Sequence, residues 1–226
     1  MGAIPEATTA SPRPGSAPSP SPPRIGVLAL QGSFALHTAV LRRLGIEAVE
    51  VRRAAALEGL DGLIIPGGES STMLKFLLEE DLFDPLVAFH REGGALYGTC
   101  AGAILLARSV ENPAQESLGL LDIEIQRNGY GRQLESHLGA CRSSELGEPD
   151  LPLVMIRGPV ISDTGPRVKV LAKWRGQPAF VREGRVLATT FHPELTDDTR
   201  IHAYFLHLAT ETRRTAAGET GGTISR

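Results

Sequence analysis

Short apolar runs alternate with segments of helical spacing along the first half of this chain. The run IGVLAL at residues 25–30 is followed by apolar side chains at helical spacing over residues 33–44. The same order recurs in IEAVEV, in GLIIPGG with a helix expected over residues 71–79, and in GALYGTCAG with a helix expected over AILLARSV. Buried strands joined by helices form parallel sheets that helices cover on both faces. The pattern therefore predicts an α/β fold built on a mainly parallel sheet.

The second half of the chain has a different pattern of apolar segments. From Leu120 onward the apolar segments are short and separated by turns, and no long helix is expected before residues 198–209. These segments are LLDIEI, HLGACR, LPLVMI, VKVLAKW, PAFVR and RVLATTF. They predict antiparallel strands that extend one side of the sheet.

The two ends of the chain differ in composition from the part between them. Residues 1–23 are rich in Pro, Ser and Ala without an apolar period, so we expect a disordered leader. Residues 211–226 have a similar character and predict a flexible tail. Residues 24–210 are expected to form one folded domain.

Charge and cysteine content narrow the classes of function. The net charge is −3 and the six histidines are scattered, which argues against a nucleic-acid partner. No window is apolar enough to span a bilayer, and the leader has no signal-peptide core. Two isolated cysteines favour a reducing, cytoplasmic setting over a secreted disulfide scaffold. No nucleotide or metal site is indicated.

The segment GTCAG has the form of a nucleophile elbow, with Cys100 between Gly98 and Gly102. It follows an apolar strand and opens a helix, so small neighbours are needed at the sharp turn, and the helix N-terminus favours a thiolate. Cys100 is therefore a candidate nucleophile, the alternative being a buried structural cysteine. Cys141 lies within a strand-like run, and we expect it to be structural.

A cysteine nucleophile requires a base and a group that orients the base. The segment FHPE follows the strand RVLATTF. Pro193 favours an extended conformation at His192, which places His192 and Glu194 on the same side of the chain. Glu194 is expected to fix one imidazole nitrogen and leave the other for Cys100. Alone, this segment also fits a surface histidine beside a capping carboxylate.

The segment PGGES follows the strand GLII. Adjacent glycines let backbone N–H groups approach a ligand, as an oxyanion hole requires. The expected donors are the N–H groups of Gly68 and Ala101, whereas a lone Gly-Gly pair also fits a plain turn.

PGGES, GTCAG and FHPEL in this order resemble the triad-type (class I) glutamine amidotransferases. Together with LQG, YGRQ and IRGP, they resemble more narrowly the glutaminase subunits of pyridoxal 5′-phosphate synthase, the PdxT family, over about residues 24–209. The resemblance implies a flavodoxin-like three-layer α/β sandwich. It also implies hydrolysis of L-glutamine to glutamate and ammonia, with Cys100 forming a thioester, His192 acting as base and acid, and Glu194 orienting His192.

The resemblance carries further roles onto this chain. It implies glutamine contacts by Gly68, Glu69, Ser70, Arg127, Ile156 and Arg157. The planar fork of an arginine suits a carboxylate, although each arginine taken alone also fits a solvated surface. Gln31 resembles the family residue near the oxyanion loop and the synthase interface, and it also fits a turn.

In this family the partner is a PdxS-type barrel synthase within a large hetero-oligomer. Ammonia passes directly to that synthase, and pyridoxal phosphate is a product rather than a cofactor of the glutaminase. The chain departs from the usual pattern at SFALH, which is less polar than the family's helix start, and at Gly129, where alanine is common. Three alternatives stay open: a glutaminase of another synthase, a stand-alone γ-glutamyl hydrolase or cysteine peptidase, and a silent docking subunit.

Overall fold

The computed structural model describes residues 21–129 and 136–218. Most of the predicted leader, the YGRQ segment from Tyr130 onward and the end of the predicted tail lie outside the described residues.

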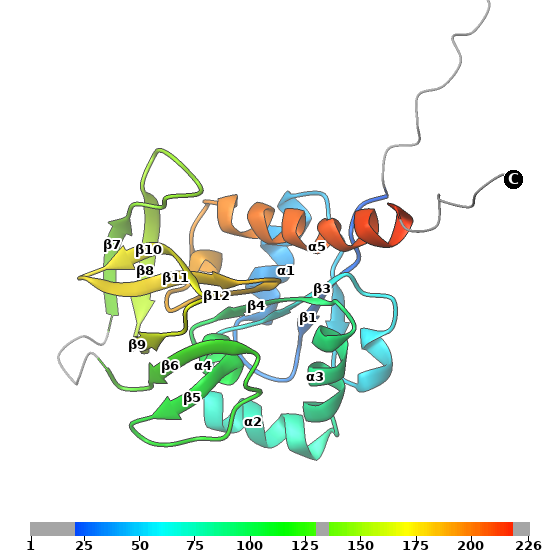
Figure 1. The fold of residues 1–226 in the computed structure, drawn as a ribbon, viewed down its shortest axis with the longest axis horizontal. Helices are drawn as coiled ribbons and strands as arrows, with labels where there is room; N and C mark the ends of the chain where they lie inside the picture. The colour runs from blue at the N-terminus through cyan, green and yellow to red at the C-terminus, as the bar shows by residue number, and fades with distance from the viewer. Residues whose placement is uncertain (1–20, 130–135, 219–226) are drawn as a thin grey trace, which may run out of the picture.

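A seven-stranded sheet forms the centre of the molecule, in the order β10-β11-β12-β4-β3-β1-β2 (Figure 1). Five neighbouring strands are parallel: β12 (Val186–Thr189), β4 (Ala95–Thr99), β3 (Gly62–Ile65), β1 (Ile25–Leu28) and β2 (Val49–Val51). β11 (Gln177–Glu183) and β10 (Lys169–Trp174) continue the sheet as antiparallel strands. The predicted mainly parallel sheet with antiparallel additions is confirmed.

Helices cover both faces of this sheet (Figure 1). One face packs against α1 (Phe34–Arg43) and α5 (Arg200–Gly218). The other packs against α2 (Ser70–Glu79), α3 (Phe83–Arg91) and α4 (Ala101–Leu106). Successive strand residues enter opposite cores, since Ile64 joins the first and Leu63 and Ile65 join the second. The result is the three-layer sandwich that the sequence predicts.

Two smaller sheets stand beside the central one. β5 (Ala107–Glu111), β6 (Leu121–Gln126) and β9 (Val160–Thr164) form the first, and β7 (Ser136–Cys141) and β8 (Leu151–Ile156) form an antiparallel hairpin. Short 3-10 turns occur at η1 (Ala54–Leu57) and η2 (Pro193–Leu195). The sequence pattern predicted that the antiparallel strands of the second half extend one side of the central sheet. This is correct for β10 and β11 and wrong for the strands of the two smaller sheets.

Two expected helices have different ends in the structure, and one observed helix was not expected. The helix expected over AILLARSV ends at Leu106, and the next residues form β5, which pairs with β6. α3 was not predicted; its proline, Pro85, lies in the first turn, where a missing N–H is tolerated. α5 continues to Gly218, beyond the helix end expected at Ala209 and into the predicted tail.

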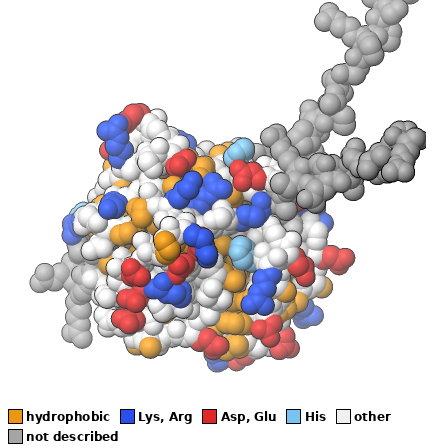
Figure 2. Space-filling view, viewed as in Figure 1, with side chains coloured by type: hydrophobic (Ala, Val, Ile, Leu, Met, Phe, Trp, Pro, Cys, Tyr) orange, Lys and Arg blue, Asp and Glu red, His pale blue; other side chains and the backbone are white. Residues whose placement is uncertain are grey.

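Basic and acidic side chains are interspersed over the face shown in Figure 2. Within the described residues, none of the helices is both long and apolar enough to cross a membrane.

Candidate active site

Cys100 lies at a sharp turn between β4 and α4. Its φ is 47° and its ψ is −99°, a left-handed conformation that is unfavourable for a side chain with a Cβ. The backbone N–H of Cys100 donates to the carbonyl oxygen of Thr189 at 2.8 Å, which ties the turn to the end of β12. The predicted elbow geometry is present, and the sulfur-bearing residue is 7% exposed.

His192 and Glu194 follow β12, the strand beside β4. His192 Nδ1 lies 2.8 Å from Glu194 Oε1, and because a carboxylate only accepts, Nδ1 donates this hydrogen bond. Glu194 is 4% exposed and His192 8% exposed. The imidazole is thereby oriented with Nε2 available to a second partner.

The structure brings His192 and Cys100 together. A Cβ placed on Gly67 would contact the His192 ring and lie 3.5 Å from Cys100 Cβ, so the three residues surround one point. Burial alone would lower the pKa of His192, but hydrogen bonds with Cys100 and Glu194 raise that pKa to about 10. His192 therefore carries a proton near pH 7 that it can give to a leaving group.

Glu194 stays ionised in this buried position. Burial alone would raise its pKa, but His37, His192 and the Ser33 hydroxyl favour the charged form and bring the pKa to about 2. Glu194 Oε1 accepts from Ser33 Oγ at 2.7 Å as well as from His192.

The PGGES loop lies against the end of β1. The carbonyl oxygen of Gly67 accepts from the Ser33 N–H at 3.0 Å, and Gln31 Oε1 accepts from the Glu69 N–H at 3.1 Å. Since the peptide plane is trans, the N–H of Gly68 points away from Ser33, opposite to the Gly67 carbonyl. A Cβ on Gly68 would meet the Gln31 side chain, so this close approach requires glycine.

The predicted glutamine-contact residues Glu69 and Ser70 already have partners within the protein. Glu69 accepts from the N–H groups of Ser71 and Thr72 and caps α2. Ser70 Oγ donates to Gln115 Oε1 at 2.9 Å.

Arg127 joins this group from β6's end. Its Nη2 lies 2.9 Å from Glu69 Oε1 and 2.8 Å from Ser71 Oγ. Neighbouring Gly129 is required by packing, because a Cβ there would overlap the side chain of Val160.

Ile156 is the last residue of β8 and Arg157 follows it, and both are exposed. The backbone N–H of His192 donates to the carbonyl oxygen of Val154 at 2.9 Å, so the end of β8 lies beside the His–Glu pair. Arg157 has a φ of 43°.

Cys141 is buried in β7, as expected for a structural cysteine. Burial and, less strongly, the charge of Asp150 raise the pKa of its thiol to about 11, which keeps it protonated.

Sequence reasoning missed three polar side chains behind Glu194, namely the partly buried Ser33 and the fully buried His37 and His202. His37 and His202 are fully buried polar residues on α1 and α5, and they lie on the face shared with the core. Their sequence signal was a histidine at a core position of each helical pattern, which the apolar periodicity alone does not separate from a surface histidine.

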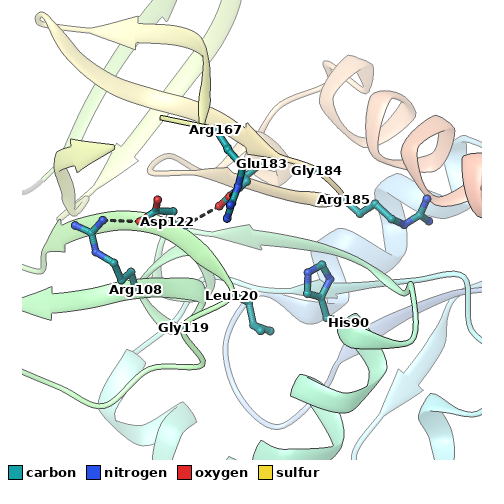
Figure 3. A pocket seen from close by; sticks show the side chains of 9 residues that line it. All are labelled: His90, Arg108, Gly119, Leu120, Asp122, Arg167, Glu183, Gly184 and Arg185. Atoms are coloured by element: carbon teal, nitrogen blue, oxygen red, sulfur yellow. Dashed lines mark hydrogen bonds and ion pairs between the residues drawn. The ribbon is translucent and has the colours of Figure 1, made fainter. Parts of the chain in front are cut away.

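A separate polar hollow of about 490 Å³ lies between α3, β6 and β11 (Figure 3). Its charged side chains neutralise one another: Arg108 pairs with Asp122, and Arg167 pairs with Glu183 at 2.8 Å. Arg185 points away from these side chains in Figure 3. The hollow contains no member of the Cys–His–Glu group.

The fold and the Cys–His–Glu arrangement are those of the triad-type glutamine amidotransferases. The chain belongs to the SNO glutamine amidotransferase family, whose model matches residues 27–211.

This chain is similar to known proteins over nearly the whole length of those proteins. The pyridoxal 5′-phosphate synthase subunit PdxT of Deinococcus radiodurans is 53% identical over 192 residues, covering 83% of this chain and 97% of that protein. The PdxT subunit of Solibacter usitatus is 50% identical over 188 residues, covering 81% of this chain and 97% of that protein. A crystal structure of a glutamine amidotransferase has a TM-score of 0.78 at 49% identity and covers 82% of this chain and 98% of that one.

Proposed function

We propose that this chain is the glutaminase subunit of a pyridoxal 5′-phosphate synthase, hydrolysing L-glutamine and delivering ammonia to a barrel-type synthase partner in a hetero-oligomer. The observation that carries the proposal is the buried 2.8 Å hydrogen bond between His192 Nδ1 and Glu194, which turns the other ring nitrogen toward the cysteine of the elbow. The similarity to PdxT proteins supports the choice of pathway.

The chemistry follows from these positions. The Cys100 thiolate adds to the carboxamide carbon of glutamine, and the N–H groups of Gly68 and Ala101 stabilise the oxyanion. The C–N bond then breaks as His192 gives its proton to the leaving nitrogen, which departs as ammonia and leaves a thioester. His192 next takes a proton from water, which hydrolyses the thioester to glutamate and restores Cys100. Glu194 keeps the imidazole oriented through both steps.

Arg127 and Arg157 are the proposed partners of the α-carboxylate of glutamine, with Gly68, Glu69, Ser70 and Ile156 lining the site. Glu69 holds Arg127 in place through the 2.9 Å ion pair, so the guanidinium can donate its remaining N–H groups to a substrate carboxylate. Gln31, which binds the Glu69 N–H, is proposed to transmit contact with the synthase to this loop.

The first experiment compares glutamate release by the full chain with and without the barrel synthase, for wild type and Cys100→Ala. We expect synthase-stimulated release in wild type and a loss of about 10³-fold or more in Cys100→Ala. Cys141→Ala is the matched control, because it removes the other buried cysteine without touching the triad, and it should keep its activity.

Each rival function has its own outcome. Equal activity with and without synthase, together with cleavage of γ-glutamyl peptides, favours a stand-alone hydrolase. Binding to the synthase without glutamate release favours a silent docking subunit. Stimulation by a different synthase only would move the chain to another pathway.

A further inference from the structure

Two buried imidazoles lie directly behind Glu194. His37 on α1 and His202 on α5 are each 0% exposed, and His37 Nδ1 lies 2.9 Å from His202 Nε2. The two helices meet on one face of the sheet (Figure 1). Polar side chains buried this deeply are costly unless they are paired, so their position needs a physical account.

The two oxygens of Glu194 are in different situations. Oε1 accepts hydrogen bonds from both His192 and Ser33, whereas Oε2 has no hydrogen-bond partner among the described residues. His37 Nε2 faces Oε2 at a distance of 3.6 Å. The same nitrogen lies 3.1 Å from the hydroxyl of Thr99, the residue before Cys100. His37 is therefore placed between the carboxylate of the triad and the strand end that carries the nucleophile.

The hydrogen bond between the two imidazoles restricts where their protons lie. Burial lowers the pKa of His37 and lowers that of His202 to about 3, so both rings are neutral near pH 7. One ring must then donate and the other accept. If His37 donated from Nδ1, its Nε2 lone pair would face the Glu194 carboxylate, and His202 would bury an Nδ1–H group without a partner among the described residues.

The opposite arrangement removes both problems. When His202 Nε2–H donates to His37 Nδ1, the proton of His37 lies on Nε2 and faces Thr99 and Glu194 Oε2. What remains unpaired is a lone pair on His202 Nδ1, which costs less than an unpaired N–H group. His202 thus determines which nitrogen of His37 carries the proton, much as a second partner fixes the tautomer of a metal-bound histidine.

We propose that His37 is a positioning residue for the glutaminase reaction, with its Nε2–H holding Glu194 and Thr99 in place and its tautomer set by His202. Ser33 and His37 are four residues apart on one face of the start of α1, so this turn contacts both oxygens of the carboxylate. The inference rests on the proposed glutaminase function.

The test measures kcat and KM for glutamine in the full chain assembled with its synthase. His37→Leu removes the N–H and should lower kcat by about tenfold with KM little changed, since His37 does not touch the substrate. His37→Gln keeps an N–H near the same place and should recover most of that loss. His202→Leu should lower kcat as well, and the double variant should be no slower than His37→Leu alone, because both changes act through one N–H group.

Leu41→Ala is the matched control for loosening α1. Leu41 is fully buried one turn beyond His37, and its apolar side chain has no group that could hydrogen-bond to the triad, so this variant should lose stability without losing kcat. An unchanged kcat in His37→Leu, or an equal loss in Leu41→Ala, would overturn the positioning role. A wild-type chain without glutaminase activity would instead overturn the proposed function itself, so the two failures are distinct.

Discussion

The position of Cys100 depends on two glycines, Gly98 and Gly102, that lie in close contact with the backbone of neighbouring residues. A Cβ placed on Gly98 would lie 2.6 Å from the carbonyl carbon of Gly102, and a Cβ on Gly102 would overlap the carbonyl oxygen of Ile65. The start of α4 therefore packs so closely on β3 and β4 that only hydrogen fits at these two positions. The flanking glycines of the elbow act through packing, while Cys100 itself adopts the positive φ.

Gly102→Ala should move the start of α4 away from the sheet. We expect the free energy of unfolding to fall by about 1–3 kcal/mol, the usual cost of overpacking, and glutaminase kcat to fall with it because Cys100 shifts. Urea unfolding and steady-state kinetics measure the two effects. Gly139→Ala is the control, since its Cβ would be in ordinary contact, 3.5 Å from Trp174 Nε1. Equal stability of the two variants would contradict the packing argument.

At the scale of elements, α2 begins at a residue with two tasks. Glu69 accepts from the Thr72 N–H at 2.7 Å and the Ser71 N–H at 3.2 Å, and it also pairs with Arg127. Burial slightly opposes ionisation, but the hydrogen bonds from Thr72 and Ser71 and the charge of Arg127 leave the pKa of Glu69 lowered. The same carboxylate thus caps the helix and positions a proposed substrate-binding arginine.

Glu69→Ala should lower the free energy of unfolding by about 1 kcal/mol at pH 7, the typical value of an N-cap. A carboxylate with a lowered folded pKa stabilises above its unfolded pKa of about 4.3, and this contribution is lost as the pH falls through the folded pKa. The gap between wild type and variant should therefore shrink in acid. Glu79→Ala, at an exposed ion pair with Lys75 on the same helix, should cost less. A gap that is constant with pH would exclude the charged cap.

The elements that sequence predicted well are those with one clear periodicity. Four of the five parallel strands are short and mainly apolar, namely IGVL, GLII, ALYGT and VLAT, whereas β2 (VEV) carries Glu50 at its centre. Cys100 directly follows β4, and His192 and Glu194 follow β12. α3 escaped prediction because Pro85 is a helix breaker except in a first turn. β5 escaped because AILLARSV is apolar enough for either period, and its pairing with β6 decided the outcome.

The residues of the candidate site that lie in sequence motifs could be predicted. Those that reach the site only through the packing of helices could not. Cys100, His192 and Glu194 stand in recognisable segments, and the structure brings them together. Ser33 and His37 lie at the start of α1, and His202 lies on α5, far away in the sequence. Ser33 and His37 contact Glu194, and His202 contacts His37, so this group depends on how α1 and α5 pack on the sheet. A contact of this kind leaves no local pattern in one sequence.

At the scale of the whole molecule, strand order assembles the site. Gln31, Gly67, Cys100 and His192 follow β1, β3, β4 and β12, and the last three of these strands are adjacent in the sheet, with β1 next to β3. Residues beyond the carboxyl ends of parallel strands share one edge, which is where sheets of this type carry ligands. The two helices on one face then contribute Ser33, His37 and His202 from behind, so the triad is supported by both the sheet and a helical layer.

The buried imidazoles should make the whole fold sensitive to acid. The pKa of His202 is lowered to about 3, and that of His37 is also lowered, both chiefly by burial. An unfolded histidine titrates near pH 6.5. Below that pH the unfolded chain therefore binds protons at these two histidines, whereas the folded chain does not. Stability must then fall as the pH drops from about 6.5 toward 5. His192, whose pKa is raised to about 10, acts in the opposite direction and only above pH 6.5.

His202→Leu should reduce this loss by up to about 1.4 kcal/mol per pH unit, the contribution of one proton, when urea unfolding is measured between pH 6.5 and 5. His207→Leu is the matched control, because His207 lies on the same helix with its side chain 68% exposed, and it should follow the wild-type slope. If His202→Leu keeps the wild-type slope, His202 is not buried as a neutral ring, and the proton arrangement that places an N–H of His37 against Glu194 loses its basis. A reduced slope in His202→Leu alone would tie the acid stability of the molecule to the pair that supports its triad.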